Sequence, residues 1–128
     1  MDKVVHFEIP VDDLERAKKF YKDVFDWKIT DIPQMNYTTL GTVEVDEKQM
    51  AKEIGAINGG MMKRDAKIPH PVITIGVENI DEAMKKVRSM GGSEIQAKIE
   101  VPNMGWSAYF KDSEGNILGL WQDTSMTR

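Results

Sequence analysis

The feature that most constrains the fold of this chain is an internal repeat. Residues 9–29 align with residues 75–95 at an offset of 66 positions. Five aligned pairs are identical, namely Ile9/Ile75, Val11/Val77, Ala17/Ala83, Lys19/Lys85 and Ile29/Ile95. Each copy runs from an alternating strand through an acidic or amide cap into an amphipathic helix and then a second strand. A repeat with this pattern predicts that the chain is a duplicated structural module.

Both copies are predicted to follow the order strand, helix and three further strands. The first strand alternates apolar residues with His6, Glu8 and Pro10, so one face is apolar and the other carries polar groups. The later strands are expected at 27–32, 36–45 and 56–63, and at 93–100, 106–112 and 116–122. This order predicts an α+β fold of one domain, 1–128, made of two tandem βαβββ modules, about 1–66 and 70–125.

Capping residues and apolar stripes define the two predicted helices. The first is expected to begin at Asp12 with Glu15 completing a capping box, and the second at Asn79 with Glu82. Gly91 and Gly92 end the second helix, because glycine enters the left-handed conformation without a Cβ clash. The expected buried stripes are Leu14, Ala17, Tyr21, Val24 and Phe25 in the first helix, and Ile80, Ala83, Val87 and Met90 in the second.

The composition narrows the function classes. The chain carries 17 basic and 21 acidic residues, a formal charge of −4, and no long basic cluster, which argues against nucleic acid as a partner. No apolar run is long enough to cross a bilayer and no signal-peptide core is present, so we expect no membrane association and a cytoplasmic location. The absence of cysteine excludes thiolate metal sites and Cys nucleophiles. Small molecules and other proteins remain as partners.

Three sequence segments carry a resemblance to a known family. They are HFEIPVDD near the N-terminus, INGGMMKR in the middle and AYFKDSEGNILGLWQ near the C-terminus. In these three segments the chain resembles the vicinal oxygen chelate superfamily. That group holds glyoxalases, bleomycin resistance proteins and extradiol dioxygenases, and the wording is most similar to the subgroup related to lactoylglutathione lyase. The resemblance implies curved mixed sheets that enclose a cavity, and a homodimer.

The same resemblance implies where a metal would be bound. Metal-dependent members place one ligand on the first and last strands of each module. His6 falls at the first of these positions and Val72 at its counterpart, while setting 57–62 against 117–122 gives Gly59 and Gly119 for the other two. Only His6 offers a donor, so the expected cofactor is none or one divalent metal ion, with His6 as its ligand. Glu8 lies two residues beyond His6 and shares its strand face.

Six residues are candidates for the site. His6 and Glu8 are the catalytic candidates: His6 is either a metal ligand or a cavity histidine bonded to a neighbour, and Glu8 is either a general base or an ordinary ion-pair partner. Ligand contacts are predicted for Trp121, Thr74, Met61 and Trp106, the last as a lip over the site. Core packing is the competing interpretation of Trp121. Tyr37 and Asn58 are expected to be ordinary strand residues, and His70 a surface residue of the Pro-rich connector.

Three functions follow from this pattern. The first is a glyoxalase-like or bleomycin-resistance-like protein that binds a small molecule in a sheet-lined cavity without the usual four-ligand metal site. The second is a metal-dependent lyase or isomerase that uses His6 with non-standard ligands. The third is a partner-binding protein with a vestigial cavity. The sequence leaves open whether the chain is an enzyme.

Overall fold

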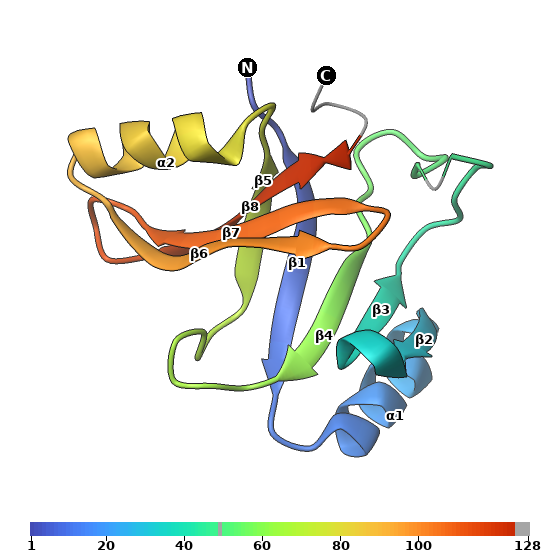
Figure 1. The fold of residues 1–128 in the computed structure, drawn as a ribbon. Helices are drawn as coiled ribbons and strands as arrows, with labels where there is room; N and C mark the ends of the chain where they lie inside the picture. The colour runs from blue at the N-terminus through green and yellow to red at the C-terminus, as the bar shows by residue number, and fades with distance from the viewer. Residues whose placement is uncertain (49, 125–128) are drawn as a thin grey trace. The chain divides into compact units, whose positions relative to one another are not determined.

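A computed structural model describes residues 1–48 and 50–124 (Figure 1). The chain forms two compact units. The N-terminal unit is residues 6–71, and the C-terminal unit is residues 1–5 together with the chain from 72 onward. No helix in the described part of the chain is long and apolar enough to span a membrane.

The N-terminal unit contains one α-helix and a four-stranded mixed sheet. Its elements are β1 (Val4–Val11, which begins just outside the unit), α1 (Leu14–Phe25), β2 (Lys28–Ile32), a 3-10 turn (Pro33–Met35), β3 (Tyr37–Gly41) and β4 (Gly59–Lys63). The strand order is β2-β3-β4-β1. The β1 and β4 strands run parallel, and the other neighbours are antiparallel.

The C-terminal unit repeats this construction. Its elements are β5 (Val72–Gly76), α2 (Ile80–Ser89), β6 (Ser93–Val101), β7 (Gly105–Lys111) and β8 (Ile117–Asp123). The strand order is β5-β8-β7-β6, with β5 parallel to β8 and the other pairs antiparallel. In Figure 1, α2 runs along one face of the strands β6 to β8. The predicted α+β fold of two βαβββ modules is therefore confirmed.

The helix caps agree with the prediction for α2 and correct it for α1. Asn79 caps α2 by accepting a hydrogen bond from the Glu82 N–H at 3.0 Å, as predicted. The α1 cap is Asp13, which accepts from the Arg16 N–H at 3.1 Å, so the expected start at Asp12 is wrong by one residue. Both neighbouring residues are aspartate, and sequence alone does not say which of them adopts the extended cap conformation.

Each unit has its own apolar core beneath its helix. Val11, Leu40 and Met61 form the N-terminal core, with Leu14, Ala17 and Tyr21 of α1 packed against it. The C-terminal core contains Ile80 and Met84 of α2 with Val77, Ala108, Phe110 and Leu120. The predicted stripes are too wide: Val24, Phe25 and Met90 are exposed, and Met84 is a buried residue that the prediction omitted. The side chains near the C-terminal end of each predicted stripe therefore lie outside the core.

The strand predicted for 36–45 is shorter than expected and ends at Gly41. Beyond Gly41 the backbone N–H groups bond to a side chain instead of to the neighbouring strand. The Asn58 carboxamide oxygen accepts hydrogen bonds from the N–H groups of Thr42 and Val43, at 2.8 and 3.0 Å. The neighbouring prediction of 56–63 is likewise too long, since β4 begins at Gly59. Asn58 is thus a structural residue that closes the end of β3.

Candidate functional site

Strand register decides which residues share a face in the N-terminal unit. Phe7 lies opposite Gly59 and Glu8 lies opposite Gly60 in the parallel β1/β4 pair. Thr39 of β3 also lies opposite Gly60, which places Tyr37 on that same face two residues away. The face that carries His6, Glu8, Tyr37 and Gly60 is called the polar face below. The opposite face holds the core residues packed against α1.

A hydrogen-bonded cluster joins three side chains on the polar face. The Tyr37 hydroxyl donates to Glu8 Oε2 at 2.7 Å, and His6 Nε2 lies 2.8 Å from the same hydroxyl. Glu8 is buried, with 8% of its surface exposed, while His6 and Tyr37 are half-buried. The imidazole and phenol rings are nearly parallel, with centroids 6.3 Å apart. The phenol therefore bridges the histidine and the carboxylate.

The bond directions fix the tautomer of His6. A phenol has one proton, and Tyr37 donates it to the Glu8 carboxylate, which can only accept. The Tyr37 oxygen must then accept from His6, so Nε2 carries the imidazole proton. Neutral His6 consequently has an unprotonated Nδ1 with a free lone pair.

Burial controls the charge of His6. Desolvation of the half-buried ring lowers the pKa of His6 below its ordinary 6.5, and the nearby Glu8 carboxylate opposes this shift without cancelling it. At neutral pH the imidazole is therefore uncharged. An uncharged histidine beside a carboxylate provides hydrogen-bond acceptors, and both groups can take up a proton.

The lowered pKa of His6 predicts a pH-dependent stability. Below pH 6.5 the unfolded chain binds a proton at His6 that the folded protein does not bind. The free energy of unfolding therefore decreases as the pH is lowered from 6.5 to the pKa of His6 in the folded protein. His6→Gln is expected to flatten this dependence in urea unfolding between pH 7.5 and about 5. His70→Gln, at an exposed histidine, is the control and should leave the curve unchanged. Identical curves for wild type and His6→Gln would contradict the assignment.

Gly60 leaves room for the Tyr37 phenol. A Cβ at position 60 would overlap the hydroxyl and the adjoining ring carbons of Tyr37. Glycine inside a strand commonly marks the close approach of another group. Tyr37 is thus more than the ordinary strand residue that its sequence context predicts, and Gly60 has a role that residue pattern alone does not assign. The Gly59-Gly60 pair inside a strand is the sequence signal for such a close approach.

The structure shifts one predicted ligand position by a residue. Thr74 lies opposite Gly119 in the parallel β5/β8 pair, just as Glu8 lies opposite Gly60 in β1/β4. The counterpart of Gly119 is therefore Gly60 rather than Gly59. Gly59 points to the other face, where an added Cβ would meet Phe7. A one-residue slip along a strand exchanges its two faces, which explains the error.

Two of the predicted ligand contacts share one face of the C-terminal unit. Thr74 and Trp121 have the parity of Gly119, opposite to that of Leu118 and Leu120, which face α2. Thr74 is buried and Trp121 is half-buried, and Ser107 lies opposite Trp121 on β7. The predicted orientation of Trp121 away from the helix is confirmed, whereas its contact with a ligand stays a prediction.

The structure places the other two predicted contacts in the cores. Met61 is fully buried in the N-terminal core, on the face toward α1, so its prediction as a wall of the binding site is wrong. Trp106 packs against the C-terminal core, with the Lys98 ammonium 5.9 Å from its ring centroid, so it forms no lip over a site. Met62, next to Met61, is half-buried and has the parity of Gly60.

The donor groups do not fit the metal site that the family resemblance implies. Gly60, Val72 and Gly119 have no side-chain donor at the remaining ligand positions, and the Tyr37 phenol fills the space above Gly60. His6 Nε2 and Glu8 Oε2 are both bonded to that phenol. Within residues 1–48 and 50–124, no three His, Asp or Glu side chains gather in a way that could hold a metal ion. A divalent site normally needs three protein ligands.

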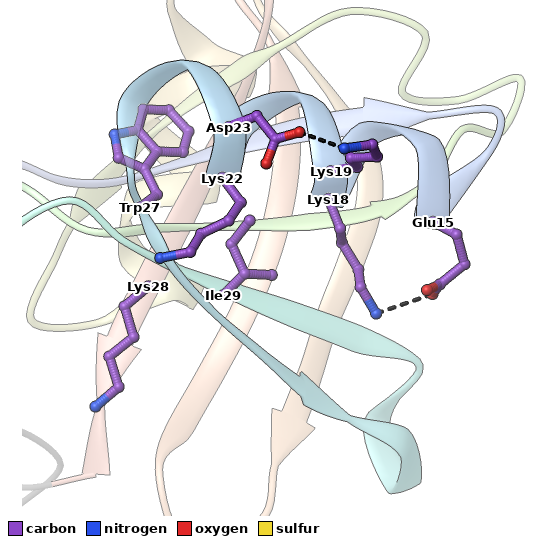
Figure 2. A pocket seen from close by; sticks show the side chains of 8 residues that line it. All are labelled: Glu15, Lys18, Lys19, Lys22, Asp23, Trp27, Lys28 and Ile29. Atoms are coloured by element: carbon purple, nitrogen blue, oxygen red, sulfur yellow. Dashed lines mark hydrogen bonds and ion pairs between the residues drawn. The ribbon is translucent and has the colours of Figure 1, made fainter.

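An open groove lies on the outer side of α1. It has a volume of about 530 Å³ and lies between α1 and the start of β2. Figure 2 shows the side chains that line it: Glu15, Lys18, Lys19, Lys22, Asp23, Trp27, Lys28 and Ile29. Lys18 is paired with Glu15 at 2.8 Å and with Asp31 at 2.7 Å, and Lys19 with Asp23 at 2.5 Å. None of the predicted site residues lines this groove. Its exposed ion pairs are those of an ordinary solvated helix face.

The sequence of this chain is similar to one family model and to proteins of other organisms. Residues 3–42 match the family model described as bleomycin resistance protein-like N-terminal. A glyoxylase-like domain-containing protein of Didymella fabae is 30% identical, with 88% of each chain covered. A lactoylglutathione lyase of Haemophilus influenzae is also 30% identical, over 92% of this chain and 98% of that protein.

Solved structures show the same fold at lower identity. A variant of Streptomyces coelicolor methylmalonyl-CoA epimerase, in complex with 2-nitronate-propionyl-CoA, has a TM-score of 0.67 at 13% identity, covering 95% of this chain and 97% of the epimerase. A glyoxalase/bleomycin resistance protein/dioxygenase superfamily member from Vibrio splendidus has a TM-score of 0.60 at 13% identity, covering 96% and 100%. At these identities the likeness establishes the fold alone.

Proposed function

Because this chain belongs to the vicinal oxygen chelate superfamily of glyoxalase-like and bleomycin-resistance-like proteins, we propose that it binds a small molecule at the polar face of its N-terminal unit, without a divalent metal. The observation that carries the proposal is the His6–Tyr37–Glu8 cluster. Burying a carboxylate on a sheet face is costly, and its hydrogen bond from the Tyr37 hydroxyl offsets part of that cost. Polar groups held in this way are typical of ligand-binding sites.

The relatives support a small-molecule ligand rather than a particular one. The Streptomyces coelicolor epimerase binds an acyl-CoA analogue on the same fold, and the Haemophilus influenzae relative is a lactoylglutathione lyase. Because one fold hosts many chemistries, the ligand class must be argued from the site residues of this chain. His6 and Glu8 can accept protons from a bound molecule, and the Tyr37 hydroxyl joins the two side chains. Thr74 and Trp121 stay proposed ligand contacts on the face that they share within the C-terminal unit.

A metal-dependent lyase or isomerase is the second candidate, favoured by the relationship to lactoylglutathione lyase. It requires Tyr37 to leave the space above Gly60 and two further ligands to join His6. The third candidate is a partner-binding protein in which the polar face has no ligand. We further propose that the protein is cytoplasmic and that it forms a homodimer, as the family resemblance implies. Sedimentation velocity measures the mass of the assembly.

Thermal shift measurements separate the three candidates. A metabolite that binds the folded protein is expected to raise its Tm, because ligand at 100 times Kd adds about 2.7 kcal/mol of stability. His6→Ala and Tyr37→Phe should each lose most of this shift, whereas His70→Ala should keep it. A metabolite panel without any hit would favour the partner-binding candidate.

The metal question needs its own measurement. Elemental analysis of protein purified without an affinity tag is expected to find no stoichiometric metal, and Ni, Zn, Mn, Fe and Mg should leave the Tm unchanged. Stoichiometric metal that is lost in His6→Ala and retained in His70→Ala would overturn the proposal in favour of the lyase or isomerase.

A further inference from the structure

The hydrogen-bond directions in the His6–Tyr37–Glu8 cluster leave it with acceptors and no free donor. The single phenol proton of Tyr37 is given to Glu8, and the Nε2 proton of His6 is given to Tyr37. The group that remains open is His6 Nδ1, which has a lone pair and no hydrogen-bond partner among the described residues. A ligand that meets the histidine at this nitrogen must therefore bring the proton itself.

The charge of the cluster points the same way. Glu8 is a buried carboxylate, and the Tyr37 hydroxyl joins it directly to His6. A second negative charge placed here would be repelled inside a partly desolvated site, whereas a cation would gain a charge-assisted contact.

We propose that the polar face takes a ligand with a cationic nitrogen, an ammonium or amidinium group, whose N–H donates to His6 Nδ1 beside Glu8. This inference rests on the proposed function, because it specifies the ligand class of the same site. It also makes Tyr37 a specificity-determining residue, since its hydroxyl engages the proton of His6 that would otherwise be offered to an anion.

Three probes of one shape and different charge test the inference. Benzamidine is cationic, benzamide is neutral and benzoate is anionic, and each is titrated into ¹⁵N-labelled full-length protein at pH 7.5. Benzamidine is expected to shift the His6 ring nitrogens and the backbone amides of Phe7 and Glu8, and benzoate is not. Glu8→Gln keeps the shape of the side chain and removes its charge, so it should weaken benzamidine binding about tenfold.

Tyr37→Phe provides the converse test. Without the phenol oxygen, the Nε2 proton of His6 loses its acceptor and becomes free to donate. Because Glu8 still repels an anion in this variant, benzoate binding at His6 is expected to appear when Tyr37→Phe is combined with Glu8→Gln, provided that the amide spectrum shows the wild-type fold. A folded double variant that still rejects benzoate would count against the role assigned to Tyr37.

The outcomes distinguish this inference from the proposed function. Benzoate shifts at His6 equal to or larger than those of benzamidine in the wild-type protein would overturn it, as would no response to any of the three probes. A metabolite hit in the thermal panel that depends on His6 but carries no cationic nitrogen would preserve the proposed function and contradict only the ligand class.

Discussion

Gly59→Ala is expected to lower the free energy of unfolding by about 1–3 kcal/mol, the usual cost of overpacking. An added Cβ would stand 2.5 Å from the Phe7 carbonyl oxygen and 2.7 Å from the Phe7 ring. Because the oxygen belongs to the backbone of the paired strand β1, it cannot move away without disturbing the ladder. Urea unfolding with linear extrapolation measures the loss. The His6 ring signals of the folded protein should stay as in the wild type.

Gly60→Ala is the matched control one residue later. Its Cβ would meet the end of the Tyr37 side chain, which can rotate away, so the backbone need not shift. The expected result is a smaller loss of stability, with the tyrosine bridge between His6 and Glu8 broken and the His6 ring signals changed. If Gly60→Ala destabilised more than Gly59→Ala and left the His6 signals unchanged, the register of β4 would have to be reassigned.

The order of helices and strands could be predicted from the sequence, because hydrophobic periodicity and helix-capping residues are local properties of the chain. Alternation in β1 and β8 correctly assigned His6, Glu8 and Trp121 to the face away from the helices. Alternation failed in β4, whose sequence is Gly-Gly-Met-Met at 59–62. A shift by one residue puts the same residue types on the same faces, so no apolar pattern selects the register. Only pairing with β1 and β3 resolves it.

Tyr37 could not be assigned from local sequence for a different reason. Its partners His6 and Glu8 lie 31 and 29 residues away, and their meeting depends on the order β3-β4-β1. The position of Tyr37 on β3 also depends on the 3-10 turn before it, which ends at Asn36 in the left-handed conformation, φ 50°. Such cross-strand contacts are set by pairing rather than by residue pattern. The candidate site was therefore half visible in the sequence, as His6 and Glu8 without the residue that joins them.

Met61→Ala is expected to cost about 2–5 kcal/mol, as large-to-small changes in a core do. Met61 is fully buried between Val11, Leu40 and the residues of α1, so truncation leaves a cavity. Met62→Ala removes the same atoms one position later, from a half-buried side chain with polar-face parity, and is expected to cost about 1 kcal/mol or less. Urea unfolding of the two variants side by side measures the difference. A larger loss from Met62→Ala would mean that β4 turns its second methionine toward α1, which would return Gly59 to the polar face and remove the space that Tyr37 occupies.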